Sequence, residues 1–247
     1  MLPVIDTPLG PIETFTVFVA IAVLAMLGAV WLSLKDCCGR EGEIVFIFPR
    51  IVVAGVVGFA CALLYDFVFK YMKYGELRLY GMGFYGGLLG GAGAMLVILR
   101  IGRSRTGLTA AQWFRVLVPG WIVFHFFGRL GCFFGGCCYG KHTDSVWGVL
   151  FPDNPANGIF HQGLKCYPTQ LYEAVALLAI LAVVLKAKNR MCTYLLSYSL
   201  VRFLIEFLRG DDRGAFPLGL SPAQWISVAI WVGLGLWAVY SRKIKRK

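Results

Sequence analysis

The chain has 247 residues, of which 58% are hydrophobic and only 15% are charged. This composition is too apolar for an ordinary soluble domain and excludes an intrinsically disordered chain. Eight cysteines are too few for a disulfide-stapled framework of this length. The net charge of +11 comes from Lys and Arg residues that separate hydrophobic runs, so we expect a lipid bilayer as the solvent and no nucleic-acid partner.

About seven stretches are long and apolar enough to cross a bilayer as helices, which takes roughly 20 residues. The third is rich in glycine, and the fourth contains Pro119, His125 and Arg129, so a re-entrant segment is an alternative for these two. The predicted fold is an all-α integral membrane bundle of about seven transmembrane helices. The stretches cover residues 14–34, 46–69, 82–99, 113–134, 169–185, 191–208 and 221–241.

The distribution of basic residues predicts the orientation, because Lys and Arg concentrate in cytoplasmic loops. With the N-terminus outside, thirteen basic residues lie on the inner side and seven on the outer side. We therefore expect the N-terminus outside and the C-terminus in the cytoplasm. The first apolar stretch lacks a basic segment before it, so we do not expect a cleaved signal peptide. No repeat or linker divides the chain, which predicts one membrane domain over residues 1–247 with an extracytoplasmic segment at about 139–168.

Four arginines fall inside these stretches or at their edges. Placing a charged side chain at the centre of a bilayer costs about 2.5–3.5 kcal/mol. Arg50 and Arg115 lie close to the starts of their stretches, so their side chains can also reach the cytoplasmic interface. Arg129 and Arg202 have no such simple explanation. They are therefore candidate functional residues that face protein or water.

Arg202 belongs to a polar stripe on the sixth stretch. Tyr198, Arg202 and Glu206 are spaced by four residues and share one helix face. A purely structural ion pair between Arg202 and Glu206 is the alternative to a functional role.

Two further segments carry charge near the expected outer surface. Arg129 lies in the glycine-rich segment GRLGCFFGGCCYGK, and Glu173 lies in YPTQLYEA, whose Pro and Thr indicate a helix start. An exposed glutamate at a helix end is common, so Glu173 alone is a weak signal. Together, however, these groups combine cations that bind phosphate with carboxylates or a phenol that can accept a proton, which indicates chemistry on a phospholipid. The residues that we expect to meet in the outer half of the bundle are Tyr85, Arg129, Glu173, Arg202 and Glu206.

Five segments in this order resemble the prolipoprotein diacylglyceryl transferase family. The segments are GPIETF near residue 10, GMGFYGGLLGG at 81–91, GRLGCFFGGCCYG at 128–140, YPTQLYEA at 167–174 and YSLVRFLIEFLR at 198–209. Members of this family are seven-span enzymes of the bacterial cytoplasmic membrane. They move a diacylglyceryl group from phosphatidylglycerol to the lipobox cysteine of a lipoprotein precursor. The resemblance thus implies a multi-pass transferase that uses these two substrates and needs no cofactor.

The resemblance also implies roles for individual residues. Arg129 and Arg202 match the essential arginines of the family and are expected to bind the phosphate of an anionic phospholipid. Glu206 and Tyr198 are expected to orient Arg202, and Glu173 to organise the outer gate. The other residues assigned to substrate binding are Gly86, Gly87, Cys132 and Gly140.

The chain departs from the family pattern at four positions, where Tyr85 and Tyr167 replace histidines, Cys132 replaces an amide and Cys137 replaces a glutamate. The change at Tyr85 matters most, because the acceptor thiol must lose a proton as its sulfur attacks. A histidine with a pKa near 6.5 suits that task better than a tyrosine near 10. Either another group takes the proton, or the chain is a diverged paralogue with another acceptor. A lipid-binding protein without catalytic activity is a third possibility.

Cysteines cluster at the outer end of the fourth stretch. The soft thiolates of Cys132, Cys137 and Cys138, with His142 just beyond, suit zinc or copper. The spacing C-x4-C-C is not that of a usual zinc knuckle, so small-residue packing or a local disulfide is favoured and no metal is expected. Thiol chemistry is another alternative, either in a membrane thiol oxidoreductase or in an acyltransferase with a cysteine nucleophile. The lack of any C-x-x-C weakens the first of these.

The remaining cysteines and histidines carry weaker expectations. Cys37 and Cys38 are expected on the cytoplasmic side in reduced form, whereas Cys166 is expected outside as a possible disulfide partner of the cluster. His125 is interpreted as a buried, hydrogen-bonded residue of an aromatic run, and His161 as a loop residue.

Overall fold

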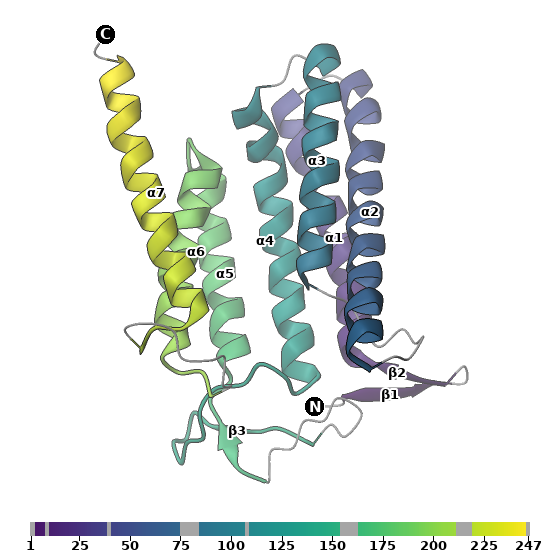
Figure 1. Ribbon diagram of the computed structural model, residues 1–247, viewed down its shortest axis with the longest axis vertical. Coiled ribbons are helices and arrows are strands. Elements are labelled where there is room, and N and C mark those ends of the chain that lie inside the picture. Colours follow the sequence, from purple (N-terminus) through teal and green to yellow (C-terminus); the bar gives the residue numbers. More distant parts are fainter. Residues whose placement is uncertain are drawn as a thin grey trace. The chain divides into compact units, whose positions relative to one another are not determined.

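The computed structural model describes residues 3–7, 10–38, 41–74, 84–106, 109–153, 163–210 and 219–245 (Figure 1). Within these ranges the chain forms seven long helices, and each overlaps one of the seven apolar stretches of the sequence. The helices are α1 (Thr14–Cys38), α2 (Glu41–Tyr74), α3 (Phe84–Thr106), α4 (Ala110–Phe134), α5 (Thr169–Lys186), α6 (Arg190–Glu206) and α7 (Pro222–Lys245).

Five of these helices are long and apolar enough to cross a membrane, namely α1, α2, α4, α5 and α7. Large apolar side chains cover their outward surfaces, as at Leu24 on α1 and Leu236 on α7. A bilayer is the solvent that accepts such a surface, so the chain is a helical membrane protein. Helix α6 is shorter, at 17 residues, and carries Arg202 and Glu206.

The third and fourth stretches, for which a re-entrant segment was the alternative, each form one continuous helix. Helix α3 runs from Phe84 to Thr106, and α4 continues through Pro119 to Phe134. Side-chain caps begin several helices. Asn189 accepts a hydrogen bond from the backbone N–H of Cys192 at 3.1 Å at the start of α6. Ser221 and Gln224 form a reciprocal capping box at the start of α7.

The described chain forms two compact units. The first comprises residues 1–29 and 118–247, and the second comprises residues 30–117. In the first unit α6 contacts both α5 and α7, and Trp231 of α7 donates a hydrogen bond to Ser199 of α6 at 2.7 Å. Its apolar core joins α4, α5 and α6 through Val118, Ile122, Leu177, Ile180, Val184 and Tyr194.

One end of the first unit gathers the segments that connect its helices. The short strands β3 (Val149–Leu150) and β4 (Lys165–Cys166) pair antiparallel. The N–H of Lys141 donates to the carbonyl of Leu208 at 2.8 Å, which ties the segment after α4 to the end of α6. The start of α1 reaches the same end, because a Cβ at Gly131 of α4 would lie 2.9 Å from the Cβ of Phe18. Before α1, strands β1 (Val4–Thr7) and β2 (Gly10–Glu13) form a hairpin.

In the second unit, α2 and α3 pack through glycines. A Cβ at Gly58 of α2 would lie 3.1 Å from the Cα of Gly91, and side chains added at Gly86 or Gly90 would collide with α2 at Cys61. Small residues thus let the two backbones approach closely, as is common between membrane helices.

Candidate active site

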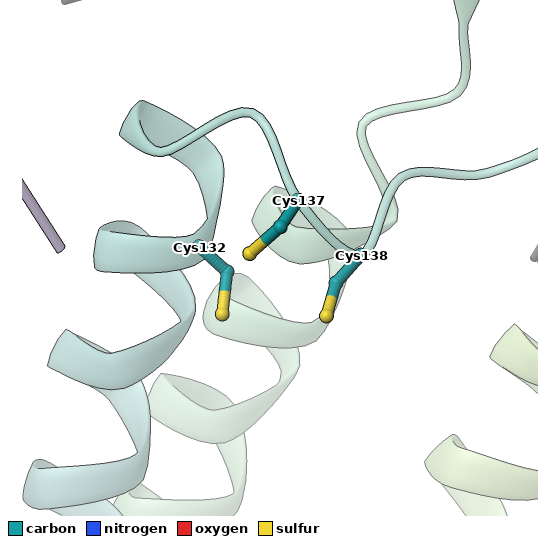
Figure 2. A group of neighbouring side chains, drawn as sticks. All are labelled: Cys132, Cys137 and Cys138. Atoms are coloured by element: carbon teal, nitrogen blue, oxygen red, sulfur yellow. The ribbon is translucent and has the colours of Figure 1, made fainter. Parts of the chain in front are cut away.

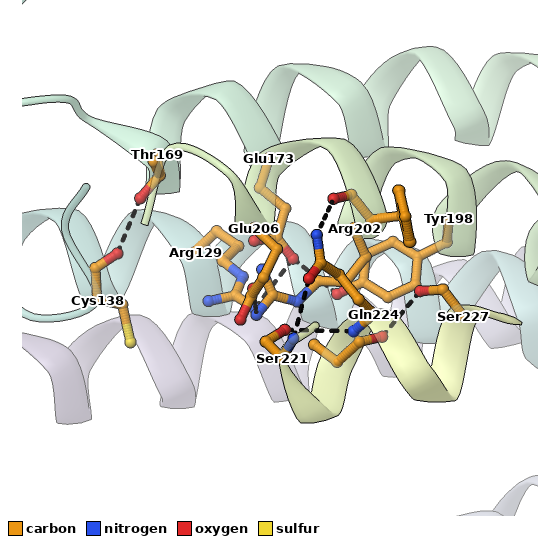
Figure 3. A network of polar contacts seen from close by, with 12 residues as sticks. Arg129, Cys138, Thr169, Glu173, Tyr198, Arg202, Glu206, Ser221, Gln224 and Ser227 are labelled. Carbon is orange, nitrogen blue, oxygen red and sulfur yellow. Dashed lines mark hydrogen bonds and ion pairs between the residues drawn. The ribbon is translucent and has the colours of Figure 1, made fainter. Parts of the chain in front are cut away.

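A buried carboxylate, that of Glu173, lies at the centre of a polar network in the first unit (Figure 3). Glu173 is in the first turns of α5 and has no exposed surface. Its Oε1 accepts hydrogen bonds from Nη2 of Arg129 at 2.9 Å and from the hydroxyl of Tyr198 at 2.7 Å. The glutamate is therefore not an exposed helix end, and it joins α4, α5 and α6.

A second ion pair lies beside the first. Nη2 of Arg202 is 2.6 Å from Oε2 of Glu206, one turn further along α6. The shared helix face of Tyr198, Arg202 and Glu206 is confirmed. The Tyr198 hydroxyl donates to Glu173, because α5 presents that carboxylate to the same face of α6.

Both arginines keep N–H groups without partners. Among the described residues, Nη1 of Arg202 and Nε of Arg129 are buried and have no hydrogen-bond partner. Leaving a charged donor buried and unpaired costs free energy, so such groups mark places where a ligand can bind. A phosphate offers several acceptor oxygens and suits two guanidinium groups.

His125 joins this network, which the sequence did not indicate. It lies on α4 one turn before Arg129, and its Nε2 is 3.5 Å from both Oε1 of Glu173 and the hydroxyl of Tyr198. The expectation of a buried, fully hydrogen-bonded histidine is met only in part, because the side chain is 19% exposed and its Nδ1 has no hydrogen-bond partner among the described residues. Its four-residue spacing from Arg129 is the one signal that places both side chains on the same helix face.

Aromatic rings pack against the ring of Tyr198. Tyr194 stacks on Tyr198 with ring centroids 5.5 Å apart, and Trp121 donates a hydrogen bond to the Tyr194 hydroxyl at 2.9 Å. These contacts fix the position of the ring that bonds Glu173.

Three cysteines gather where α4 ends (Figure 2). The sulfur atoms of Cys132, Cys137 and Cys138 all lie within 4.8 Å of one another. None of the six cysteines whose side chains are described forms a disulfide, so the expected local disulfide is absent from this part of the chain. Cys166 does not join the cluster either. Its sulfur lies 3.3 Å from Nδ1 of His142, and burial raises the pKa of its thiol.

Two residues at the start of α5 hold the backbone of the cluster. Thr169 Oγ1 donates to the carbonyl of Cys138 at 2.9 Å, and Gln170 Nε2 donates to the carbonyl of Cys137 at 2.7 Å. No spacing in the sequence relates these residues to the cysteines. Cys138 adopts a positive φ of 63°, which is uncommon for a residue other than glycine.

Gly140 lies where three segments meet. Its N–H donates to the carbonyl of Tyr167 at 2.8 Å. A Cβ at this position would lie 2.7 Å from the carbonyl oxygen of Leu208 and 2.9 Å from Cγ2 of Thr169. The contacts of Gly140 are thus with the protein itself, and they hold the ends of α4, α5 and α6 together.

The other predicted site residues belong to the second unit. Gly86 and Gly87 lie in α3 and pack against α2. Tyr85 lies in the first turn of the same helix, but its side chain lies outside the described residues, as do those of Cys37 and Cys38 and the whole of His161. Arg115 is exposed near the start of α4, which agrees with a side chain at the membrane interface.

Arg50 of α2 bonds within its own helix. Its Nη1 donates to the carbonyl of Phe46, and its guanidinium lies 3.4 Å from the centroid of the Phe46 ring. These contacts place the charge of Arg50 against its own helix.

Comparison with known proteins matches residues 4–240 to the family described as prolipoprotein diacylglyceryl transferase. A protein of Clostridium perfringens named phosphatidylglycerol–prolipoprotein diacylglyceryl transferase 2 is 37% identical over 166 residues, which is 63% of this chain and 61% of that protein. A Polynucleobacter necessarius transferase is 30% identical over 84% of this chain and 73% of its own length. A Geobacter sulfurreducens transferase is 27% identical over 87% of both.

The extent of the match differs among these relatives. It spans about three fifths of the two Clostridium proteins, at 61% for that of C. perfringens and 60% for that of C. tetani. The match to the family itself covers nearly all of the chain, from residue 4 to residue 240. This chain therefore belongs to the prolipoprotein diacylglyceryl transferase family.

Proposed function

We propose that this protein transfers the diacylglyceryl group of phosphatidylglycerol to the cysteine of a lipoprotein precursor in the bacterial cytoplasmic membrane. Membership of the family and the names of its relatives support this reaction. In the reaction the acceptor sulfur bonds to the glyceryl carbon, the bond from that carbon to the phosphate oxygen breaks, and glycerol phosphate leaves with the electron pair. The proton of the acceptor thiol is released to water.

The observation that carries the proposal is the unpaired Nη1 of Arg202, which is buried beside an ion pair in an apolar bundle. A phosphodiester is the anionic part of phosphatidylglycerol and would accept a hydrogen bond from this group. Nε of Arg129 offers a second free donor. Charge builds up on the phosphate as glycerol phosphate leaves, so fixed guanidinium donors stabilise the transition state.

The other residues of the network position the two arginines. Glu173 holds Arg129 and Glu206 holds Arg202, which fixes each guanidinium before the lipid arrives. Tyr198 acts through Glu173, and Gly140 keeps the surrounding segments together. Four further residues are assigned to substrate binding only by their places in the family motifs. They are Tyr85, Gly86, Gly87 and Cys132.

The proposed topology places all seven helices across the membrane as one domain, with the N-terminus outside and the C-terminus in the cytoplasm. The start of α1 and the segments after α4 and α6 share one end of the first unit, which supports an outer location for all three. Five basic residues lie from Arg242 onward, three of them in the last turns of α7 and two in the sequence that follows it. This charge favours the cytoplasm.

Transfer by purified variants tests this proposal. The assay follows thioether formation on a lipobox peptide and release of glycerol phosphate from labelled phosphatidylglycerol. We expect Arg202→Gln to lose about 100-fold or more of the rate, as when a preorganised donor to a developing charge is removed. Arg242→Gln, an exposed change at the far end of α7, is the matched control and should keep the wild-type rate.

A melting curve in detergent shows whether the Arg202 variant is folded. A folded Arg202→Gln protein with the full transfer rate would disprove the phosphate-binding role. Release of glycerol phosphate without peptide lipidation would show that the acceptor is not a lipobox cysteine.

A further inference from the structure

The three-cysteine cluster at the end of α4 has the dimensions of a metal site. The three sulfur atoms lie within 4.8 Å of one another. Thiolates bound to one zinc ion at about 2.3 Å in tetrahedral geometry lie roughly 4 Å apart. Small side-chain rotations therefore bring all three sulfurs to bonding distance of a common point.

The backbone holds these side chains in place. The N–H of Cys137 bonds the carbonyl of Cys132 at 3.1 Å, which closes the last turn around the cluster. The hydrogen bonds from Thr169 and Gln170 of α5 fix the carbonyls of Cys138 and Cys137. Ligands that are oriented by such surrounding contacts are typical of metal sites in proteins.

The charge of the surroundings suits a divalent ion. Three thiolates and Zn²⁺ together carry one negative charge. Arg209, which is 6% exposed, interacts electrostatically with Cys138, and Arg129 interacts electrostatically with Cys132 and Cys138. These cations offset the negative charge of a zinc–thiolate centre.

We propose that Cys132, Cys137 and Cys138 bind a zinc ion whose fourth position is open, and that the acceptor thiol coordinates there. Three protein ligands with one exchangeable position are the arrangement of catalytic zinc sites. The three cysteines are only partly buried, so a fourth ligand has access to them.

The use of this position rests on the proposed transfer reaction. A thiol that coordinates zinc loses its proton, which passes to water. The zinc-bound sulfur then bonds to the glyceryl carbon, the bond from that carbon to the phosphate oxygen breaks, and glycerol phosphate leaves with the electron pair. The thioether product carries no charge and is a weak ligand, so it dissociates. Zinc thereby supplies the deprotonation of the acceptor thiol.

Metal binding is tested first and without any activity assay. The full chain is reduced, purified in detergent, stripped with a chelator and titrated with Co²⁺ and then Zn²⁺. We expect the protein to bind about one equivalent of Co²⁺ and to show the sulfur-to-cobalt charge-transfer band of a thiolate site. Zinc should displace the cobalt and abolish this band. Cys132→Ser, Cys137→Ser and Cys138→Ser should each weaken this band, and Cys192→Ser at the start of α6 should leave it unchanged.

Three results would overturn the metal site. The first is a wild-type chain that binds no cobalt, and the second is cobalt binding that survives in the triple serine variant. The third is a disulfide between two of the three cysteines in protein isolated without reductant, if that protein cannot be loaded with metal.

The catalytic use of zinc is tested in the transfer assay. Removal of the metal should lower peptide lipidation about 100-fold, and zinc should restore it, because a proton-transfer aid of this kind contributes that much. Full transfer by metal-free protein would overturn this use. If zinc binds but the wild-type protein releases no glycerol phosphate, the transfer reaction itself fails while the metal site stands.

Discussion

Arg129 of α4 and Glu173 of α5 form a buried ion pair, with Nη2 of the arginine 2.9 Å from Oε1 of the glutamate. The glutamate has no exposed surface, and the arginine side chain is 16% exposed. Such a pair is costly to bury, yet removing one partner costs more, because the other charge is then left uncompensated. The pair therefore fixes α4 against α5 and orients the guanidinium that we assign to the phospholipid.

Glu173→Gln should lower the free energy of unfolding by about 3–5 kcal/mol, the usual cost of breaking a buried pair from one side. The amide keeps the size of the side chain but not its charge. Unfolding in mixed detergent micelles measures the loss. Asp144→Asn, a matched change at an exposed position in the segment after α4, should change stability little. Equal stability of the Glu173 variant and wild type would show that the pair is not formed.

Tyr198→Phe removes the hydroxyl that donates to Glu173 at 2.7 Å. A hydrogen bond to a charged group contributes about 1.5–3 kcal/mol, so we expect a loss of that size in the same unfolding measurement. Tyr194→Phe is the matched control on the same helix face, and it removes the hydroxyl that accepts the Trp121 N–H. Its loss should be about 0.5–1.5 kcal/mol. A larger loss for Tyr194→Phe than for Tyr198→Phe would contradict this order.

Gly140→Ala should destabilise the protein by about 1–3 kcal/mol, the typical cost of overpacking. The added methyl would lie 2.7 Å from the carbonyl oxygen of Leu208 and 2.8 Å from Cβ of Tyr167. Gly128→Ala in the same sequence segment meets nothing within 4 Å, so it should be tolerated. Thermal melting of both variants in detergent checks the difference, and similar melting temperatures would count against the close contact.

The predicted orientation is tested by labelling introduced cysteines in intact cells. Lys141→Cys, in the segment after α4, should react with a membrane-impermeant maleimide above the level of the parent protein. Lys188→Cys, between α5 and α6, should react only after permeabilisation, because we place that turn in the cytoplasm. Both lysines are exposed on the protein surface, so a difference in labelling would report the side of the membrane and not burial within the protein. The reverse pattern would invert the topology.

Helix positions could be predicted from the sequence, because hydrophobic stretches of this length leave few other structures in a bilayer. The stretch 191–208 corresponds to α6 at Arg190–Glu206, and 169–185 corresponds to α5 at Thr169–Lys186. The common face of Tyr198, Arg202 and Glu206 also followed from spacing alone, since residues four apart are neighbours on a helix.

Contacts between helices could not be predicted in this way. Periodicity places Arg129 and Glu173 on their own helices but does not say which helix faces which. It therefore gave no sign that Glu173 would be completely buried or that His125 would lie beside it. The glycines of α3 show the same limit, because their close contact with Cys61 depends on how α2 is placed.

The stoichiometry of transfer by the wild-type protein tests the central claim most directly. Purified protein is incubated with phosphatidylglycerol labelled in its terminal glycerol and with a lipobox peptide. Both the thioether peptide and the labelled glycerol phosphate are then quantified by mass spectrometry. We predict that the two products appear together in equal amounts and that neither forms when the peptide cysteine is replaced by serine. Absence of both products from folded protein supplied with zinc would contradict the assignment of this chain as a diacylglyceryl transferase.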